Sequence, residues 1–139
     1  MAFMQWQDSY SVGVPAMDIQ HKQLVAMVNQ LYEAMRTSKG DAAIQNILPA
    51  LVQYTRTHFN SEEKLMHEAG YPNIAAHQAL HHKLAQQVAD LMDKFKSGKM
   101  VPTVSVATFL KDWLVNHIQG QDKQYGAYIA QRQLVGAAR

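Results

Sequence analysis

The stretch HFNSEEKLMHEAGYPNIAAHQALH, residues 58–81, contains two helical segments on either side of a short break. The intervening AGYP sequence combines glycine and proline, which interrupt helices. His58 and Glu62 lie four residues apart before the break, and His77 and His81 have the same spacing after it. Residues four apart share one face of a helix. The stretch therefore predicts two antiparallel helices that bring both pairs of side chains to the same end of a bundle.

Apolar residues recur at helical spacing along most of the remaining chain. In the first helix these positions run from Ile19 through Leu24 to Met35. Short connections favour an all-α, up-down-up-down antiparallel four-helix bundle. We expect a single domain over residues 1–139, with an extended N-terminal arm and a short C-terminal helix. In order, the arm, the four bundle helices and the last helix are predicted at residues 1–17, 18–37, 41–68, 73–96, 103–118 and 122–134.

Two residues are unusual inside these predicted helices. Pro49 has no amide hydrogen and should kink the second helix or divide it near residue 48. Gly120 is expected to interrupt the helical structure between the fourth helix and the C-terminal one. Lys39 and Gly40 should stop the first helix, and Asp41 should cap the start of the second.

Composition excludes several classes of function. The 139 residues suit one domain, and the formal net charge of only +2 gives little reason to expect nucleic-acid or membrane binding. The absence of cysteine excludes disulfides, thiolate catalysis and thiolate-bound metals. The residue pattern predicts no targeting segment, and no apolar run approaches the roughly 20 residues of a membrane span. We expect a soluble cytoplasmic protein.

Five of the seven histidines, together with two carboxylates, fall on four predicted helices at positions that can converge. Burying so many imidazoles and acids among apolar residues would be costly unless a metal bound them. Imidazole and carboxylate without thiolate indicate non-haem iron, with zinc or manganese as alternatives on ligand type alone. The candidate ligands are His21, His58, Glu62, His77, His81, His117 and Asp122.

The weakest spacing in this set is the five-residue step from His117 to Asp122. On an ideal α-helix these side chains diverge by about 140°. A π-type widening of the helix, or a break at Gly120, would realign them, and such bulges are frequent at functional sites.

The ligand count predicts what the site can bind. If two six-coordinate irons share it, the imidazoles, two bridging carboxylates and one oxo or hydroxo bridge fill every coordination position but one. A metal with three histidines would be full, and one with two histidines would be open. The site could then take one small exogenous molecule.

His21 and the segments HFNSE (58–62), HQALH (77–81), HIQGQD (117–122) and DKQYGAYI (122–129) resemble the hemerythrin family, most closely its single-domain bacterial members. The resemblance implies a diiron centre in which His77, His81 and His117 bind the saturated iron and His21 and His58 bind the open one. Glu62 and Asp122 would bridge the two irons. It also implies that O2 binds reversibly at the open iron, in a pocket formed by Leu114, with Phe59 and Trp113 as neighbours.

The expected function is therefore non-enzymatic O2 binding for storage, delivery or sensing, by a monomer. Nitric oxide or small anions are further candidate ligands, and an oxygen-using enzyme is a candidate recipient. The alternatives are a diiron enzyme (oxidase, peroxidase or nitric oxide reductase) and an iron-buffering module. Ferritin-like diiron enzymes use Glu-x-x-His motifs from two helices, and this chain contains no Glu-x-x-His.

Overall fold

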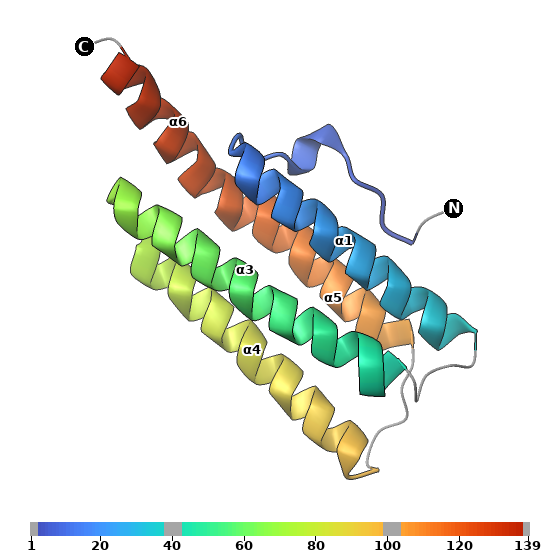
Figure 1. The fold of residues 1–139 in the computed structure, drawn as a ribbon. Coiled ribbons are helices and arrows are strands. Elements are labelled where there is room, and N and C mark those ends of the chain that lie inside the picture. Colours follow the sequence, from blue (N-terminus) through green and yellow to red (C-terminus); the bar gives the residue numbers. More distant parts are fainter. Residues whose placement is uncertain (1–2, 38–42, 99–103, 138–139) are drawn as a thin grey trace.

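The computed structural model describes residues 3–37, 43–98 and 104–137, which contain helices and no strand. A short 3-10 turn, η1 (Asp8–Tyr10), lies in the N-terminal arm. The elements that follow it are α1 (Pro15–Arg36), η2 (Ala43–Ile47), α3 (Leu48–Ala69), α4 (Ile74–Lys96), α5 (Val104–His117), η3 (Ile118–Asp122) and α6 (Lys123–Ala137). Figure 1 shows the long helices side by side in one bundle. The predicted all-α four-helix bundle is confirmed.

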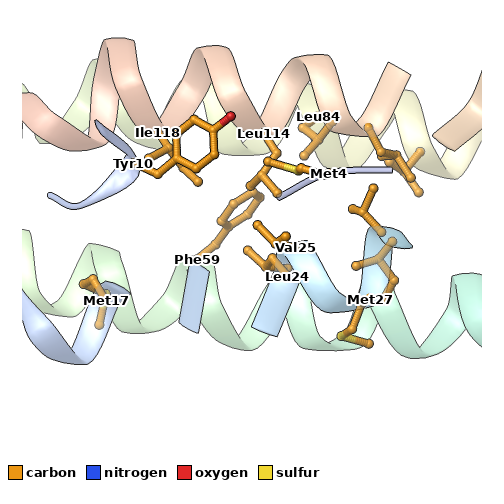
Figure 2. Packing of buried hydrophobic residues seen from close by; sticks show 14 of the residues in the cluster. Met4, Tyr10, Met17, Leu24, Val25, Met27, Phe59, Leu84, Leu114 and Ile118 are labelled. Carbon is orange, nitrogen blue, oxygen red and sulfur yellow. The ribbon is translucent and has the colours of Figure 1, made fainter. Parts of the chain in front are cut away.

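Four helices, α1, α3, α4 and α5, surround one apolar core. Helix α1 packs against both α3 and α5, and α3 packs against α4. Leu31 and Met66 are fully buried, and Leu114 and Phe59 approach the core from opposite sides of the close view in Figure 2. Within the described residues, no helix is both long enough and apolar enough to cross a membrane.

The first helix begins earlier than predicted, at Pro15 instead of Asp18. Proline fits the first turn because its missing N–H would have no partner there. Asp18 binds the arm, accepting hydrogen bonds from the Val12 amide at 2.9 Å and the Ser11 hydroxyl at 2.6 Å. Ile19 matches the helical spacing but is 67% exposed. Ile19 thus fits the helical spacing of the apolar residues, but its side chain does not lie in the core.

The second predicted helix changes from π-helix to α-helix next to Pro49, where the sequence predicted a kink or a division, and it stays helical across the junction. A π-helical segment, η2, ends at Ile47 and α3 starts at Leu48, so that Pro49 lies in the first turn of α3. The proline therefore removes no hydrogen bond from the middle of an α-helix. The predicted cap at Asp41 and the stop at Lys39 and Gly40 lie outside the described residues.

The turn between α3 and α4 forms as the sequence predicts. Gly70 adopts the left-handed conformation, with a φ of 70°, and its N–H donates to the His67 carbonyl at 3.1 Å. The next amide, of Tyr71, donates to the Met66 carbonyl at 2.9 Å. Glycine adopts this conformation without steric cost. The chain therefore reverses within a few residues and starts α4 at Ile74.

The C-terminal part of the bundle corrects one prediction. Gly120 does not interrupt the helix. It lies within the π segment η3, and the helix continues into α6. In Figure 1, α5 and α6 follow one another as a long continuous rod. The last helix ends at Ala137, beyond the predicted residue 134. A single glycine weakens a helix by only about 1 kcal/mol relative to alanine, so that tertiary packing can override it.

The N-terminal arm is fixed against the bundle. Met4 is 2% exposed, and its amide and carbonyl both bond to the side chain of Asn29, at 2.7 and 2.8 Å. Further along, Val12 lies so close to α6 that a Cβ on Gly126 would overlap its carbonyl oxygen. Glycine at position 126 thus permits the arm to approach α6 directly.

Candidate metal centre

All seven predicted ligands lie in one buried cluster. They come from five elements, because α1 supplies one, α3 and α4 supply two each, and the end of α5 and the end of η3 supply one each. None is more than 6% exposed. In chain order they are His21, His58, Glu62, His77, His81, His117 and Asp122. The local spacing places each pair on one helix face, and the tight turn at Gly70 brings the α3 and α4 pairs to adjoining levels.

The π segment resolves the five-residue step between His117 and Asp122. A π-helix has i→i+5 spacing, so residues five apart return to the same side. The Oδ1 atom of Asp122 lies 3.0 Å from Nε2 of His117. Of the two realignments that the sequence allowed, a widened helix or a broken one, the structure contains the first.

The cluster divides into two overlapping groups of candidate ligands. One holds three histidines, His77, His81 and His117, and the other holds two, His21 and His58. Glu62 and Asp122 belong to both groups. Within each group the candidate ligand atoms all lie within 4.8 Å of one another. Such a division suits two metal ions that share two carboxylates.

Each shared carboxylate directs one oxygen toward each group. Oε2 of Glu62 lies 3.1 Å from His21 Nε2 and Oε1 lies 3.3 Å from His81 Nε2. Likewise, Oδ2 of Asp122 lies 3.1 Å from His21 Nε2 and Oδ1 lies 3.0 Å from His77 Nε2. This arrangement is what a bridging carboxylate requires, because each of its oxygens must contact a different ion.

The donor atoms fit metal ions better than they fit one another. Nε2 of His117 lies 3.1 Å from Nε2 of both His77 and His81. Two nitrogen ligands at right angles, each about 2.1 Å from an ion, lie about 3.0 Å apart. Both oxygens of Asp122 and one oxygen of Glu62 are buried and face histidine Nε2 atoms, but the geometry of these contacts is too poor for hydrogen bonds. Buried polar atoms are normally satisfied, so the positions of these oxygens fit a bound cation.

The electrostatics of the cluster support the same conclusion. Burial opposes the charged form of Asp122, but the close contacts of its oxygens with the His117 and His21 rings outweigh it and hold the Asp122 pKa at about 2. The pKa of Glu62 is likewise held well below its usual value by histidine hydrogen bonds, despite burial. Burial also disfavours protonated His21, yet Asp122 and Glu62 raise its pKa to about 9. Metal uptake near neutral pH should therefore release a proton from His21.

Aromatic rings stack on two histidines of the cluster, and a small apolar cavity lies beside them. Phe59 stacks on His81 with 3.7 Å between ring centroids, and Trp113 stacks on His117 at 4.3 Å. Phe59, Trp113 and Leu114 line a small cavity of about 30 Å³, which Leu24 also lines. Figure 2 shows Phe59 directed from α3 toward Leu114, with Leu24 nearby. The structure thus places the three predicted pocket residues around one apolar space beside the cluster.

Three residues that contact the cluster were not predicted. The Tyr125 hydroxyl, fully buried, donates to Glu62 Oε2 at 2.6 Å. Gln20 and Glu63 contact the outer ring nitrogens of His58 and His81. The sequence did hold signals, since Tyr125 is three residues after Asp122 and so shares its helix face, and the other two adjoin ligands in the chain. His67 and His82, predicted to face solvent, are exposed.

Replacing Tyr125 with phenylalanine should reduce stability by about 1.5–3 kcal/mol, because a buried hydrogen bond to a charged group is lost. Iron content measured with iron in excess should stay unchanged, since the hydroxyl contacts a ligand oxygen and would not itself bind the metal. Chemical denaturation measures the first quantity and metal analysis the second. Tyr128→Phe is a matched control, because its hydroxyl donates to the neutral Gly70 carbonyl at an exposed site. Equal losses in both variants would contradict a special role for Tyr125.

The fold and the cluster together define a class of protein, a four-helix bundle with a buried cluster of histidines and two shared carboxylates that could hold metal ions. The hemerythrin HHE cation binding domain matches residues 12–129. Bacteriohemerythrin of Methylococcus capsulatus is 41% identical over 91% of this chain and 96% of its own, and that of Stenotrophomonas maltophilia is 39% identical over 90% and 80%. A wild-type hemerythrin crystal structure superposes with a TM-score of 0.86 at 39% identity, covering 92% of this chain and 98% of that one. The chain belongs to the hemerythrin family.

Proposed function

We propose that this protein binds O2 reversibly at a non-haem diiron centre, for oxygen storage, delivery or sensing. One observation carries the proposal: the candidate ligands divide unequally, with three histidines in one group and two in the other, around the same two carboxylates. Two equivalent six-coordinate ions would leave the two-histidine side short of one ligand. Family membership supports iron as the metal, because hemerythrin domains bind a non-haem diiron centre.

In this proposal the seven residues of the cluster are the iron ligands. His77, His81 and His117 hold one iron, His21 and His58 hold the other, and Glu62 and Asp122 bridge the two. The ferrous pair would supply the electrons that make O2 binding strong and reversible. Glu62 and Asp122 keep the two ions together, and the pKa values of both carboxyl groups favour the ionised form that binds cations.

The apolar residues beside the centre would keep water away from the bound gas. Phe59 and Leu114 carry no group that donates or accepts a proton, and both are nearly fully buried. A dry pocket disfavours protonation and loss of a reduced oxygen species. The pocket therefore supports binding and release in preference to turnover. Delivery to an oxygen-using enzyme stays a prediction of this proposal.

The reversibility of O2 binding tests the proposal against a diiron enzyme. Reduced protein exposed to air should develop a visible charge-transfer band that disappears when O2 is removed and returns in a second cycle. Immediate and irreversible oxidation on first exposure would contradict it. Steady consumption of O2, peroxide or nitric oxide with an added reductant would favour the enzymatic alternative instead.

Leu114→Ala tests the role of the pocket. The substitution should leave iron bound but speed autoxidation several-fold, because it opens the apolar space beside the cluster to water. The measurement is the decay rate of the oxygenated band. Leu48→Ala is the control: Leu48 is equally buried but lies ten residues before His58 on α3, about 15 Å along the helix. An autoxidation rate that Leu114→Ala leaves unchanged would exclude Leu114 from the pocket.

A further inference from the structure

Two histidines of the cluster have different partners at their outer ring nitrogens. Nδ1 of His58 lies 2.6 Å from Oε1 of Gln20, and Nδ1 of His81 lies 3.0 Å from Oε2 of Glu63. Both partner oxygens only accept hydrogen bonds, so each imidazole donates from Nδ1. That tautomer leaves the lone pair on Nε2, the atom that faces the cluster in both residues. Gln20 and Glu63 thus present the two rings as ligands.

The two partners differ in charge, although their shapes are nearly the same. Gln20 is a neutral amide that precedes His21 on α1, and Glu63 is a carboxylate that follows Glu62 on α3. An imidazole that donates to a carboxylate becomes a more basic ligand than one that donates to a neutral group. The Glu63 side chain is 26% exposed, so solvent weakens its field without removing it. His81 is therefore the stronger electron donor of the two.

This difference coincides with the division of the cluster. The carboxylate of Glu63 is hydrogen-bonded to His81, a member of the three-histidine group, and the neutral amide of Gln20 is hydrogen-bonded to His58, a member of the two-histidine group. A more electron-donating, more negative environment stabilises a ferric ion over a ferrous one. The arrangement thus favours the higher oxidation state on the three-histidine side and leaves the two-histidine side, where the open position falls, easier to keep ferrous.

We propose that Gln20 and Glu63 are positioning residues that fix the ligating tautomers of His58 and His81 and, through their unequal charge, set the order in which the two irons are oxidised. The proposal rests on the proposed diiron function. Neither residue touches an iron or O2; each acts through the ring to which it is hydrogen-bonded.

Two isosteric substitutions change the charge in opposite directions. In Glu63→Gln, the Nδ1–H of His81 keeps a hydrogen-bond acceptor but loses the negative charge of the carboxylate. The affinity of the site for ferric iron should therefore fall about tenfold relative to its affinity for ferrous iron. That change raises the corresponding one-electron potential by about 59 mV. Gln20→Glu adds a carboxylate beside His58 and should lower the one-electron reduction potential of the iron on the two-histidine side by a similar amount. The double variant should bring the sum of the two potentials back toward the wild-type value.

The experiment is a mediated redox titration of the iron-loaded protein without oxygen, with iron content measured on each sample. Gln23→Glu on α1 and Glu68→Gln on α3 are matched controls, because they make the same charge changes at exposed positions. Structural damage would move both test variants in the same direction or reduce their iron content, whereas the proposal predicts shifts of opposite sign at unchanged iron content. Potentials that do not move beyond those of the controls would overturn this inference alone. Two irons per chain without reversible O2 binding would overturn only the proposed function, and wild-type protein that takes up no iron would overturn both.

Discussion

Replacement of His117 by alanine is expected to remove most of the iron from the protein. Its Nε2 atom lies within 3.1 Å of Nε2 of both His77 and His81 and 3.0 Å from Asp122, so that it stands at the centre of the three-histidine group. Loss of an outer partner of a ligand costs about 10- to 100-fold in metal affinity, and loss of the ligand itself should cost more. Metal analysis of the purified variant measures the effect.

Controls for this variant are available on the same helices. His67→Ala and His82→Ala remove exposed imidazoles from α3 and α4 and should leave iron content unchanged. Wild-type iron content in His117→Ala would refute the ligand assignment. Loss of iron in all three variants would point to general damage instead of a specific site.

Removal of the metal should lower the thermal unfolding midpoint by about 10 °C or more. Without a cation, the oxygens of Glu62 and Asp122 lie buried against histidine rings, with protonated His21 as the nearest positive charge. A ligand that binds only the folded state adds about 4 kcal/mol of stability at a free concentration about 1,000 times its dissociation constant. Each kcal/mol moves the midpoint of a domain of this size by about 2–4 °C.

Calorimetry before and after treatment with a chelator measures this difference. The His117→Ala variant serves as the reference, because a protein that holds little metal should not respond to the chelator. An identical midpoint in the wild-type protein with and without metal would show that the stability of the fold does not depend on a bound cation.

Most of the bundle follows from local signals in the sequence. Helical periodicity locates the four helices, Gly70 with Pro72 locates the turn after α3, and Pro49 locates the change from π-helix to α-helix at the start of α3. Local signals fail where tertiary contacts decide. The first helix begins at Pro15, and Asp18 in its first turn bonds to the arm at Ser11 and Val12, contacts that no residue pattern in the sequence predicts.

The candidate site was predictable to the extent that helix geometry places side chains. The four-residue spacings indicate shared faces directly, and the His117–Asp122 spacing indicates that the helix has to deviate. Whether it widens or breaks depends on the packing of Ile118 and Asp122, the buried residues on either side of exposed Gly120, which the sequence leaves open. Contacts between elements are harder still: the bond from Tyr125 to Glu62 joins residues 63 positions apart, and only the assembled bundle reveals it.

The most direct test of the central claim is an optical O2 titration of the fully reduced protein, with iron measured on the same sample. The unequal division of histidines around Glu62 and Asp122 predicts saturation at one O2 for every two irons, with full recovery of the reduced spectrum when O2 is withdrawn. Saturation at one O2 per iron, a different metal in the place of iron, or the absence of any O2-dependent band would contradict the account.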